Sequence, residues 1–416
     1  MKDAKNTLWT RDFTIITVGS VVSMLGSSLS SFAMNLMVLD YTGSKLLYAI
    51  YIAMYTVPQV IVPIFSGALL DRFSRKKTIY TLDFISAGMY LAVAIVVYKG
   101  YFSFVLFAVF VFLLGCISSM YNVAYESLYP LLISEGNYQK AYSIASMLET
   151  LTNVMIPISA VVYRYVGIVP LFLIDTLSFF IAAVMETRIK TDEEYIETQK
   201  ETKAEGVSKT GQMLLDLKEG FKYLKEEKGL MRISVYFFFS CIVGGVSSVI
   251  MLPYFRENFD NGEFVYMMVG GMLVLGRAIG GGIHYKTVLP KEYRYKIAFA
   301  VYIMIGFIEG FYMYLPVAVM MALMFVDGIS GVTSYTIRLS ATRSYVPDEK
   351  KGRFNGAFFM LMTVGSLVGE FLAGVMSLVL PDRAIMTIVC MVGVASAVVL
   401  IGGGKKYVAP IYNRVQ

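Results

Sequence analysis

Long apolar stretches alternate with short charged ones along this sequence, and this alternation constrains the fold more than any other feature. A helix that crosses a bilayer needs about 20 apolar residues. Twelve stretches approach or exceed that length. They lie at residues 13–39, 46–70, 78–98, 102–128, 138–163, 168–188, 231–255, 263–285, 296–314, 316–338, 353–380 and 384–403. The sequence therefore predicts an all-α, polytopic membrane protein with 12 transmembrane helices.

The overall composition agrees with a membrane environment. Apolar residues make up 57% of the chain and charged residues 16%, whereas soluble domains carry about 25% charged residues. The three cysteines lie inside apolar runs, in no spacing typical of a metal site or a disulfide framework. The first apolar run has no small-residue cleavage site, so we expect a membrane helix there rather than a signal peptide.

A polar stretch from about residue 189 to residue 228 divides the apolar runs into two sets of six. Its second part places Leu214, Leu217, Phe221 and Leu224 at helical spacing, which predicts an amphipathic helix lying on the membrane or against the bundle. A faint repeat, ISEGNYQK from Ile133 and VPDEKKGR from Val346, favours two pseudo-symmetric bundles. The predicted divisions are a first bundle (1–188), a cytoplasmic linker (189–229), a second bundle (230–404) and a cytoplasmic tail (405–416).

Lysine and arginine are distributed unequally between the two sets of alternating loops. One set, with both termini, carries 30 of these residues, and the other carries five. Basic residues concentrate on the cytoplasmic side of membrane proteins. We therefore expect both termini in the cytoplasm, and the basic residues need no nucleic acid to explain them.

The loop after the second apolar stretch carries the most specific motif, GALLDRFSRKK, from Gly67 to Lys77. An acid at the end of one span, with arginines three residues apart after it, can form a clasp of charges across helix ends. Asp83, in the next span, can complete the clasp. The alternative, that the loop is only a basic cytoplasmic turn, does not explain Asp71 and Asp83.

This motif resembles the signature of the major facilitator superfamily, a group of transporters built from repeats. Other stretches, such as LDYTGS and LFLIDTLSFF, resemble its branch of macrolide and siderophore exporters. The second half lacks the acid-basic signature, and Pro157 is all that is left of the antiporter motif, which argues against proton-coupled antiport. The resemblance implies a cytoplasmic gate that closes by rocking of the two bundles, with Arg353 as the clasp's partner. The predicted gating residues are Gly67, Asp71, Arg72, Arg75, Lys76, Asp83 and Arg353.

In the family that this chain resembles, the first, fourth, seventh and tenth helices line the central cavity. Each of these stretches carries a stripe of polar or small residues, for example Ser23, Ser27, Ser31 and Asn35 in the first. The alternative is that such residues only hold helices together. The candidates for substrate or proton binding are Asn35, Asn122, Tyr125, Glu149, Asp327, Ser334 and Arg338.

Ionisable residues inside membrane spans are costly and therefore informative. Asp327 lies most centrally in a cavity helix, as a substrate or proton residue or as a structural partner of Arg338 or of a backbone group. Glu149 and Arg277 are predicted to form an interdomain pair, either a gate or a static bridge. Glu370 also lies in a packing helix, and its role stays open. For Asp175, Glu309 and His284 structural roles are favoured.

The predicted function is secondary active transport, with export of amphipathic small molecules such as drugs, antibiotics or siderophores by a rocker-switch mechanism, and coupling to protons is left open. Alternatives are transport of a lipid-like or nutrient solute, and a transport-dead sensor or scaffold. The sequence shows no nucleophile–base pair, metal cluster or phosphate loop, so neither an enzyme nor a cofactor is expected. We expect a monomer in the plasma membrane, with small-molecule substrate, protons and lipid as partners.

Overall fold

In the computed structural model, the regular secondary structure of the described part of the chain is helical. The structure describes residues 7–70, 74–134, 137, 141, 144, 148, 159, 162–163, 165–191, 209–287 and 289–414. The helices are α1 (Arg11–Thr42), α2 (Lys45–Leu70), α3 (Arg75–Tyr98), α4 (Phe104–Leu128), α6 (Ile168–Glu186), α8 (Lys209–Glu226), α9 (Lys228–Asn258), α10 (Gly262–Lys286), α11 (Arg294–Phe311), α12 (Val317–Tyr345), α13 (Asp348–Met376), α14 (Asp382–Ser396) and α15 (Lys405–Tyr412).

Eleven of the described helical segments are long and apolar enough to cross a membrane. They coincide with eleven of the twelve predicted spans, and the remaining one, 138–163, falls largely outside the described residues. The all-α, polytopic fold predicted from the sequence is thereby confirmed. The break between the ninth and tenth spans comes at Tyr312–Tyr314, a 3-10 turn, before Pro316 caps α12.

The chain divides into two compact units. One comprises residues 1–43 and 54–212, and the other residues 44–53 and 213–416. Residues 45–53 of this second unit form the beginning of α2, so a short piece of an early helix packs with late ones. Gly374 of α13 illustrates this contact, because a Cβ there would come 2.7 Å from Ala49 Cβ.

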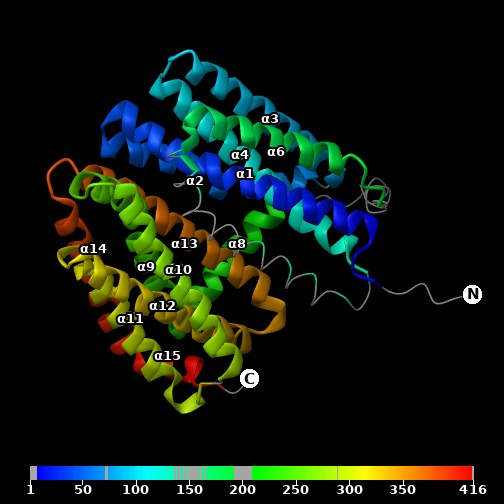
Figure 1. Cartoon of the computed structure of the whole chain (residues 1–416). Helices are drawn as coiled ribbons and strands as arrows, with labels where there is room; N and C mark the ends of the chain where they lie inside the picture. Colours follow the sequence, from blue (N-terminus) through cyan, green and yellow to red (C-terminus); the bar gives the residue numbers. More distant parts are fainter. Residues whose placement is uncertain are drawn as a thin grey trace, which may run out of the picture. The chain divides into compact units, whose positions relative to one another are not determined.

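In the first unit, α6 packs along both α1 and α3, and α3 also contacts α4 (Figure 1). Glycine permits the close approach of α1 to α6: a Cβ on Gly26 would lie 2.5 Å from Asp175 Oδ1 and closer still to Ser178 Oγ. Small residues are the usual means by which membrane helices approach each other. The spacing of α1 and α6 thus depends on this glycine.

In the second unit, the most extensive contacts pair α10 with α12, α9 with α13 and α11 with α14 (Figure 1). Glycines again lie at the crossings. A Cβ on Gly245 of α9 would come 2.2 Å from the Ser366 carbonyl oxygen, and one on Gly369 of α13 would come 2.2 Å from that of Ile242. The backbones of α9 and α13 therefore touch directly over two turns.

Two helices that do not resemble membrane spans close one end of this unit. In α8, Leu224 is buried as its amphipathic pattern predicts, but Phe221 stays exposed and Tyr223 is buried beside Leu224. The segment predicted as a tail forms α15, whose Val408, Ile411 and Tyr412 lie in the same core cluster as α8 residues.

Candidate functional site

A pair of glycines sets the geometry around the central acid of the second unit. A Cβ on Gly276 of α10 would lie 2.1 Å from the Phe325 carbonyl oxygen, and one on Gly328 of α12 would lie 2.2 Å from that of Leu273. Arg277 directly follows the first glycine, and Asp327 directly precedes the second. The closest crossing of α10 and α12 therefore brings a cation and an acid into one neighbourhood.

Asp327 is buried at this crossing and is only 5% exposed. Its Oδ1 accepts no hydrogen bond from any described residue. The positive charge of Arg277 interacts electrostatically with Asp327, and Glu309 of α11 interacts electrostatically with both of them. Asp327 is buried and Glu309 is half-buried, whereas Arg277 is exposed. A buried carboxyl group whose oxygen lacks a hydrogen-bond partner is suited to holding a proton.

Arg338, the sequence-predicted structural partner of Asp327, lies three turns further along α12. Its guanidinium carbon is 5.0 Å from the ring centre of Phe237, 5.3 Å from that of Tyr335 and 4.9 Å from that of Phe358. An arginine stacked on aromatic rings is stabilised by cation–π attraction. In the described part of the chain, Arg338 therefore contacts aromatic faces rather than Asp327.

The predicted interdomain pair is not available for inspection, because Glu149 lies outside the described residues. Within its own unit, the charge of Arg277 acts on Asp327 and on Glu309. His284 also lies on α10 and contacts α12: its Nε2 is 2.8 Å from Thr333 Oγ1. His284 and Thr333 thereby add a polar contact to the packing of α10 against α12.

The polar stripes of the predicted cavity helices fall into two kinds. On α9, Ser240, Gly244 and Ser248 are exposed although the helix is otherwise largely buried. Asn122 of α4 is also exposed, and Asn35 of α1 is half-buried. The stripe of α12 is different, because its members are buried inside the bundle. These members are Asp327, Ser330 and Ser334.

Tyr125 of α4 belongs to a ladder of stacked phenol rings. Its ring centre lies 6.0 Å from that of Tyr121 and 5.2 Å from that of Tyr129. The hydroxyl of Tyr121 donates to Glu186 Oε1 at 3.5 Å, and that of Tyr129 donates to the Ala141 carbonyl at 2.8 Å. Tyr125 is therefore packed beside a buried acid of α6.

The structure places the predicted gating residues unevenly. Asp71 and Arg72 lie outside the described residues, as do the surroundings of Gly67. Arg75 donates from Nη1 to the Ser127 carbonyl at 3.0 Å, and Lys76 donates from Nζ to the Thr191 carbonyl at 2.8 Å. Both basic residues thus fasten the beginning of α3 to neighbouring helix ends.

Arg353, predicted as the partner of the clasp, forms a salt bridge with Glu219 of α8, with 2.5 Å between Nη1 and Oε2. Asp83, predicted as a member of the clasp, is only 1% exposed and lies against the carboxyl group of Glu186. The clasp itself stays a prediction.

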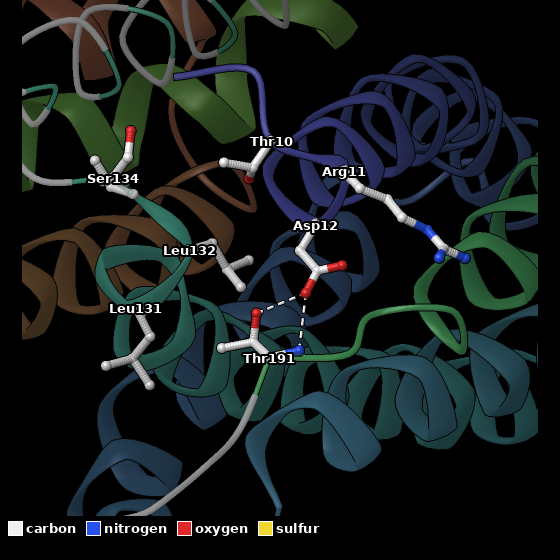
Figure 2. A pocket seen from close by; sticks show the side chains of 8 residues that line it. Thr10, Arg11, Asp12, Leu131, Leu132, Ser134 and Thr191 are labelled. Carbon is white, nitrogen blue, oxygen red and sulfur yellow. Dashed lines mark hydrogen bonds between the residues drawn. The ribbon is translucent and has the colours of Figure 1, made fainter. Parts of the chain in front are cut away.

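A cleft of about 420 Å³ opens at the end of the first unit where α1 begins. Figure 2 shows Asp12 pointing toward Thr191, with Arg11 turned away from it. Asp12 Oδ2 accepts hydrogen bonds from the backbone nitrogens of Lys190 and Thr191, at 3.0 and 2.8 Å, and from Thr191 Oγ1 at 2.7 Å. Through these three hydrogen bonds, Asp12 Oδ2 ties α1 to the residues that follow α6.

Sequence reasoning missed Glu186, which is fully buried. As the last residue of α6 it resembles the ordinary polar end of a span. Its spacing from Asp175 could have indicated its burial, because two acids 11 residues apart lie on the same face of a helix. Gly19 and Gly26, seven apart on α1, face the same two acids, since a Cβ on Gly19 would lie 3.3 Å from Glu186 Oε1.

Outside the spans, Tyr345 at the end of α12 donates its hydroxyl to Glu227 Oε2 at 2.8 Å. Burial first, and the hydrogen bond and charge of Glu227 next, raise the pKa of Tyr345 to about 12. Tyr223 of α8 also has a raised pKa, through burial and the same glutamate. The interactions of Tyr345 and Tyr223 with Glu227 connect α8 to α12. In the described part of the chain no group of His, Cys, Asp and Glu side chains is arranged to hold a metal ion.

The sequence of the chain identifies its protein family. The pattern of the Major Facilitator Superfamily matches residues 16–369. The chain is a member of that superfamily. It is therefore a multi-span membrane transporter, and it is not an enzyme.

Relatives in this superfamily are distant. The chain is 25% identical to the MFS-type transporter YkuC of Bacillus subtilis (strain 168), over 67% of this chain and 66% of that protein. It is 22% identical to macrolide efflux protein A of Streptococcus pyogenes, over 65% and 67% of the two chains. These alignments span about two thirds of each relative's length.

Solved structures confirm the fold. A crystal structure of the nucleoside transporter NupG is similar with a TM-score of 0.62 and 12% identity, covering 96% of this chain and 100% of that chain. A peptide transporter POT structure in complex with alafosfalin has a TM-score of 0.66 and 12% identity, covering 95% of both chains. At such identities the likeness concerns the fold alone.

Proposed function

We propose that this transporter exports amphipathic small molecules of the drug or antibiotic class, and that protons drive it through Asp327. The observation that carries the coupling is the buried carboxyl group of Asp327, whose Oδ1 has no described partner and which lies beside the charge of Arg277. In a site of low dielectric constant, gain or loss of one proton changes the local free energy strongly. Such a change can bias a rocking of two bundles.

Exposed polar side chains in the middle of apolar helices support a substrate-binding role, separately in the first unit and in the second. Ser240, Ser248 and Asn122 are exposed in the middle of apolar helices, where a cavity wall is expected to carry hydroxyl and amide groups. They bear no charge, which suits a neutral or amphipathic substrate. Similarity to macrolide efflux protein A favours export of such compounds.

The gate is proposed to be the clasp around Asp71, Arg72 and Arg75, which holds the cytoplasmic side shut while the site faces outward. The distribution of lysine and arginine supports the orientation, with both termini in the cytoplasm of a plasma-membrane protein. Asp71→Asn should leave insertion into the membrane intact and slow transport. Normal transport by that variant in vesicles would contradict the clasp.

Accumulation of a panel of dyes, macrolides and siderophores tests the proposed function, in cells with and without the protein and with or without an uncoupler. We expect lower accumulation of amphipathic cations or neutral compounds when the protein is present, and loss of this difference with the uncoupler. Higher accumulation would indicate uptake, and no difference across the panel would favour the scaffold alternative.

Asp327→Asn is the decisive variant, and Glu292→Gln, an exposed carboxylate of the same unit, is the matched control. With Asp327→Asn we expect transport to lose its dependence on the pH gradient, while Glu292→Gln keeps it. A gradient dependence that survives in Asp327→Asn would rule out the proposed proton role.

A further inference from the structure

The first unit contains an acid pair that the proposed coupling through Asp327 does not use. Asp83 of α3 and Glu186 of α6 are 1% and 0% exposed. Their carboxyl groups lie within hydrogen-bonding distance of each other. A carboxylate can only accept hydrogen bonds, so a bond between two carboxyl groups requires a proton on one of them.

The side chains around the pair supply few donors. Tyr121 donates to Glu186 Oε1, but no ordinary donor in the described part of the chain reaches Asp83 Oδ2 or Glu186 Oε2. Ser20 of α1, 5% exposed, faces the phenol groups of Tyr121 and Tyr125. Its hydroxyl therefore belongs to the same buried polar group and does not reach the free oxygens of Asp83 and Glu186.

The charges near the pair add to the need for a proton. Asp175, which precedes Glu186 by three turns on α6, is a third acid that interacts electrostatically with Asp83. Among the described residues, Gly19 and Ser20 of α1 and Tyr121 and Tyr125 of α4 face the pair or its surroundings, and none of these four carries a positive charge. Arg75, at the beginning of α3, donates to the Ser127 carbonyl. Two like charges in contact in such a place cannot both be ionised.

We propose that Asp83 and Glu186 form a second proton-binding site, which holds one exchangeable proton within the first bundle. The proton has a short route to the outside, because Glu186 ends α6 and the next two residues, Thr187 and Arg188, are exposed. Protonation is therefore a property of the pair, which takes up and releases its proton as a unit. The inference does not depend on the role of Asp327 or on the substrate.

Infrared spectroscopy of the purified protein in lipid nanodiscs, titrated from acid to alkaline pH, tests the site directly. A protonated carboxyl group has a carbonyl stretching band that shifts in heavy water and disappears on deprotonation. We expect the wild-type band to persist at neutral pH and to disappear reversibly at higher pH. We expect Asp83→Asn and Glu186→Gln each to remove one such band. Both substitutions keep shape and hydrogen-bonding capacity, and Glu126→Gln, an exposed acid of α4, should leave the band unchanged.

Each alternative outcome overturns the proposal. A band that survives in both variants, or is missing from the wild type, would show that the pair binds no proton. A band that never responds to pH while the protein stays folded would indicate a locked, structural proton. Loss of the band on addition of sodium at constant pH, but not of choline, would indicate a metal-cation site instead. The melting temperature of each variant, measured alongside, shows whether the variant is folded.

Discussion

Lys45 and Asp382 form a salt bridge of 2.7 Å between Nζ and Oδ2, although 337 residues separate them. The same Nζ lies 2.8 Å from Glu257 Oε2. Lys45 begins α2, Asp382 begins α14, and Glu257 lies near the end of α9. The ammonium group of Lys45 thus connects the ends of α2, α9 and α14. These salt bridges help to explain why the beginning of α2 belongs to the second unit.

Lys45→Met should weaken this fastening. Asp382 is 7% exposed and Glu257 57% exposed, so the loss falls mainly on Asp382, which would keep a buried charge without its cation. A hydrogen bond to a charged group contributes about 1.5–3 kcal/mol, and we expect the free energy of unfolding to fall by about 2 kcal/mol. Thermal unfolding in detergent measures this change.

Two controls accompany Lys45→Met. Glu257→Gln, at the exposed partner, should cost less than about 1 kcal/mol. Asp382→Asn added to Lys45→Met should recover part of the loss, because the buried charge is then removed. A double variant less stable than Lys45→Met would show that the salt bridge is not the cause.

The positions of the spans were predictable because apolar length is a local property of the chain. The crossings were not, since which glycine touches which backbone depends on the packing of two helices. Gly276 and Gly328, 52 positions apart in sequence, illustrate this limit. The sequence singled out Asp327 as the most central acid of its helix, and the structure buries it. The predicted pair of Glu149 and Arg277 stays a prediction, because Glu149 lies outside the described residues.

The site in the first unit was only half predictable. Asp83 stood out as an acid inside a span, and the family motif beside it suggested a gate. Glu186 did not stand out, because a carboxylate at the end of an apolar run is ordinary. Only the packing of α1 with α6, set by small residues, shows that this helix end is buried.

Tyr345→Phe should remove the hydrogen bond to Glu227 and lower stability by about 1–2 kcal/mol. The pKa of Tyr345 is raised in the folded state, so the neutral phenol is stabilised by folding. Its contribution is complete below the ordinary pKa of about 10 and is lost as the pH rises toward 12. The difference in melting temperature between wild type and Tyr345→Phe should therefore be constant from about pH 6 to 9 and shrink above pH 10. A difference that changes near neutrality would contradict this assignment.

Gly220 and Glu219 of α8 should differ sharply in their tolerance of substitution. A Cβ on Gly220 would lie 2.3 Å from the Arg353 carbonyl oxygen, which is backbone and cannot turn away. Gly220→Ala should therefore lift α8 from α13 and cost about 1–3 kcal/mol. Glu219→Gln breaks only a salt bridge between half-exposed side chains and should cost less than about 1 kcal/mol. Limited proteolysis of α8 together with thermal unfolding measures both effects, and equal effects would refute the contact.

Gly328→Ala tests whether the close crossing of α10 and α12 places Asp327 for its role. The added Cβ would lie 2.2 Å from the Leu273 carbonyl and 2.8 Å from the Arg277 nitrogen, so the helices must move apart. We expect stability to fall by about 1–3 kcal/mol and gradient-driven transport to fall further, since Asp327 and Arg277 separate. Gly331→Ala, on the same helix with open space around it, should be neutral or slightly stabilising. Because the two variants make the same chemical change one turn apart, equal transport by both would show that the crossing does not position Asp327.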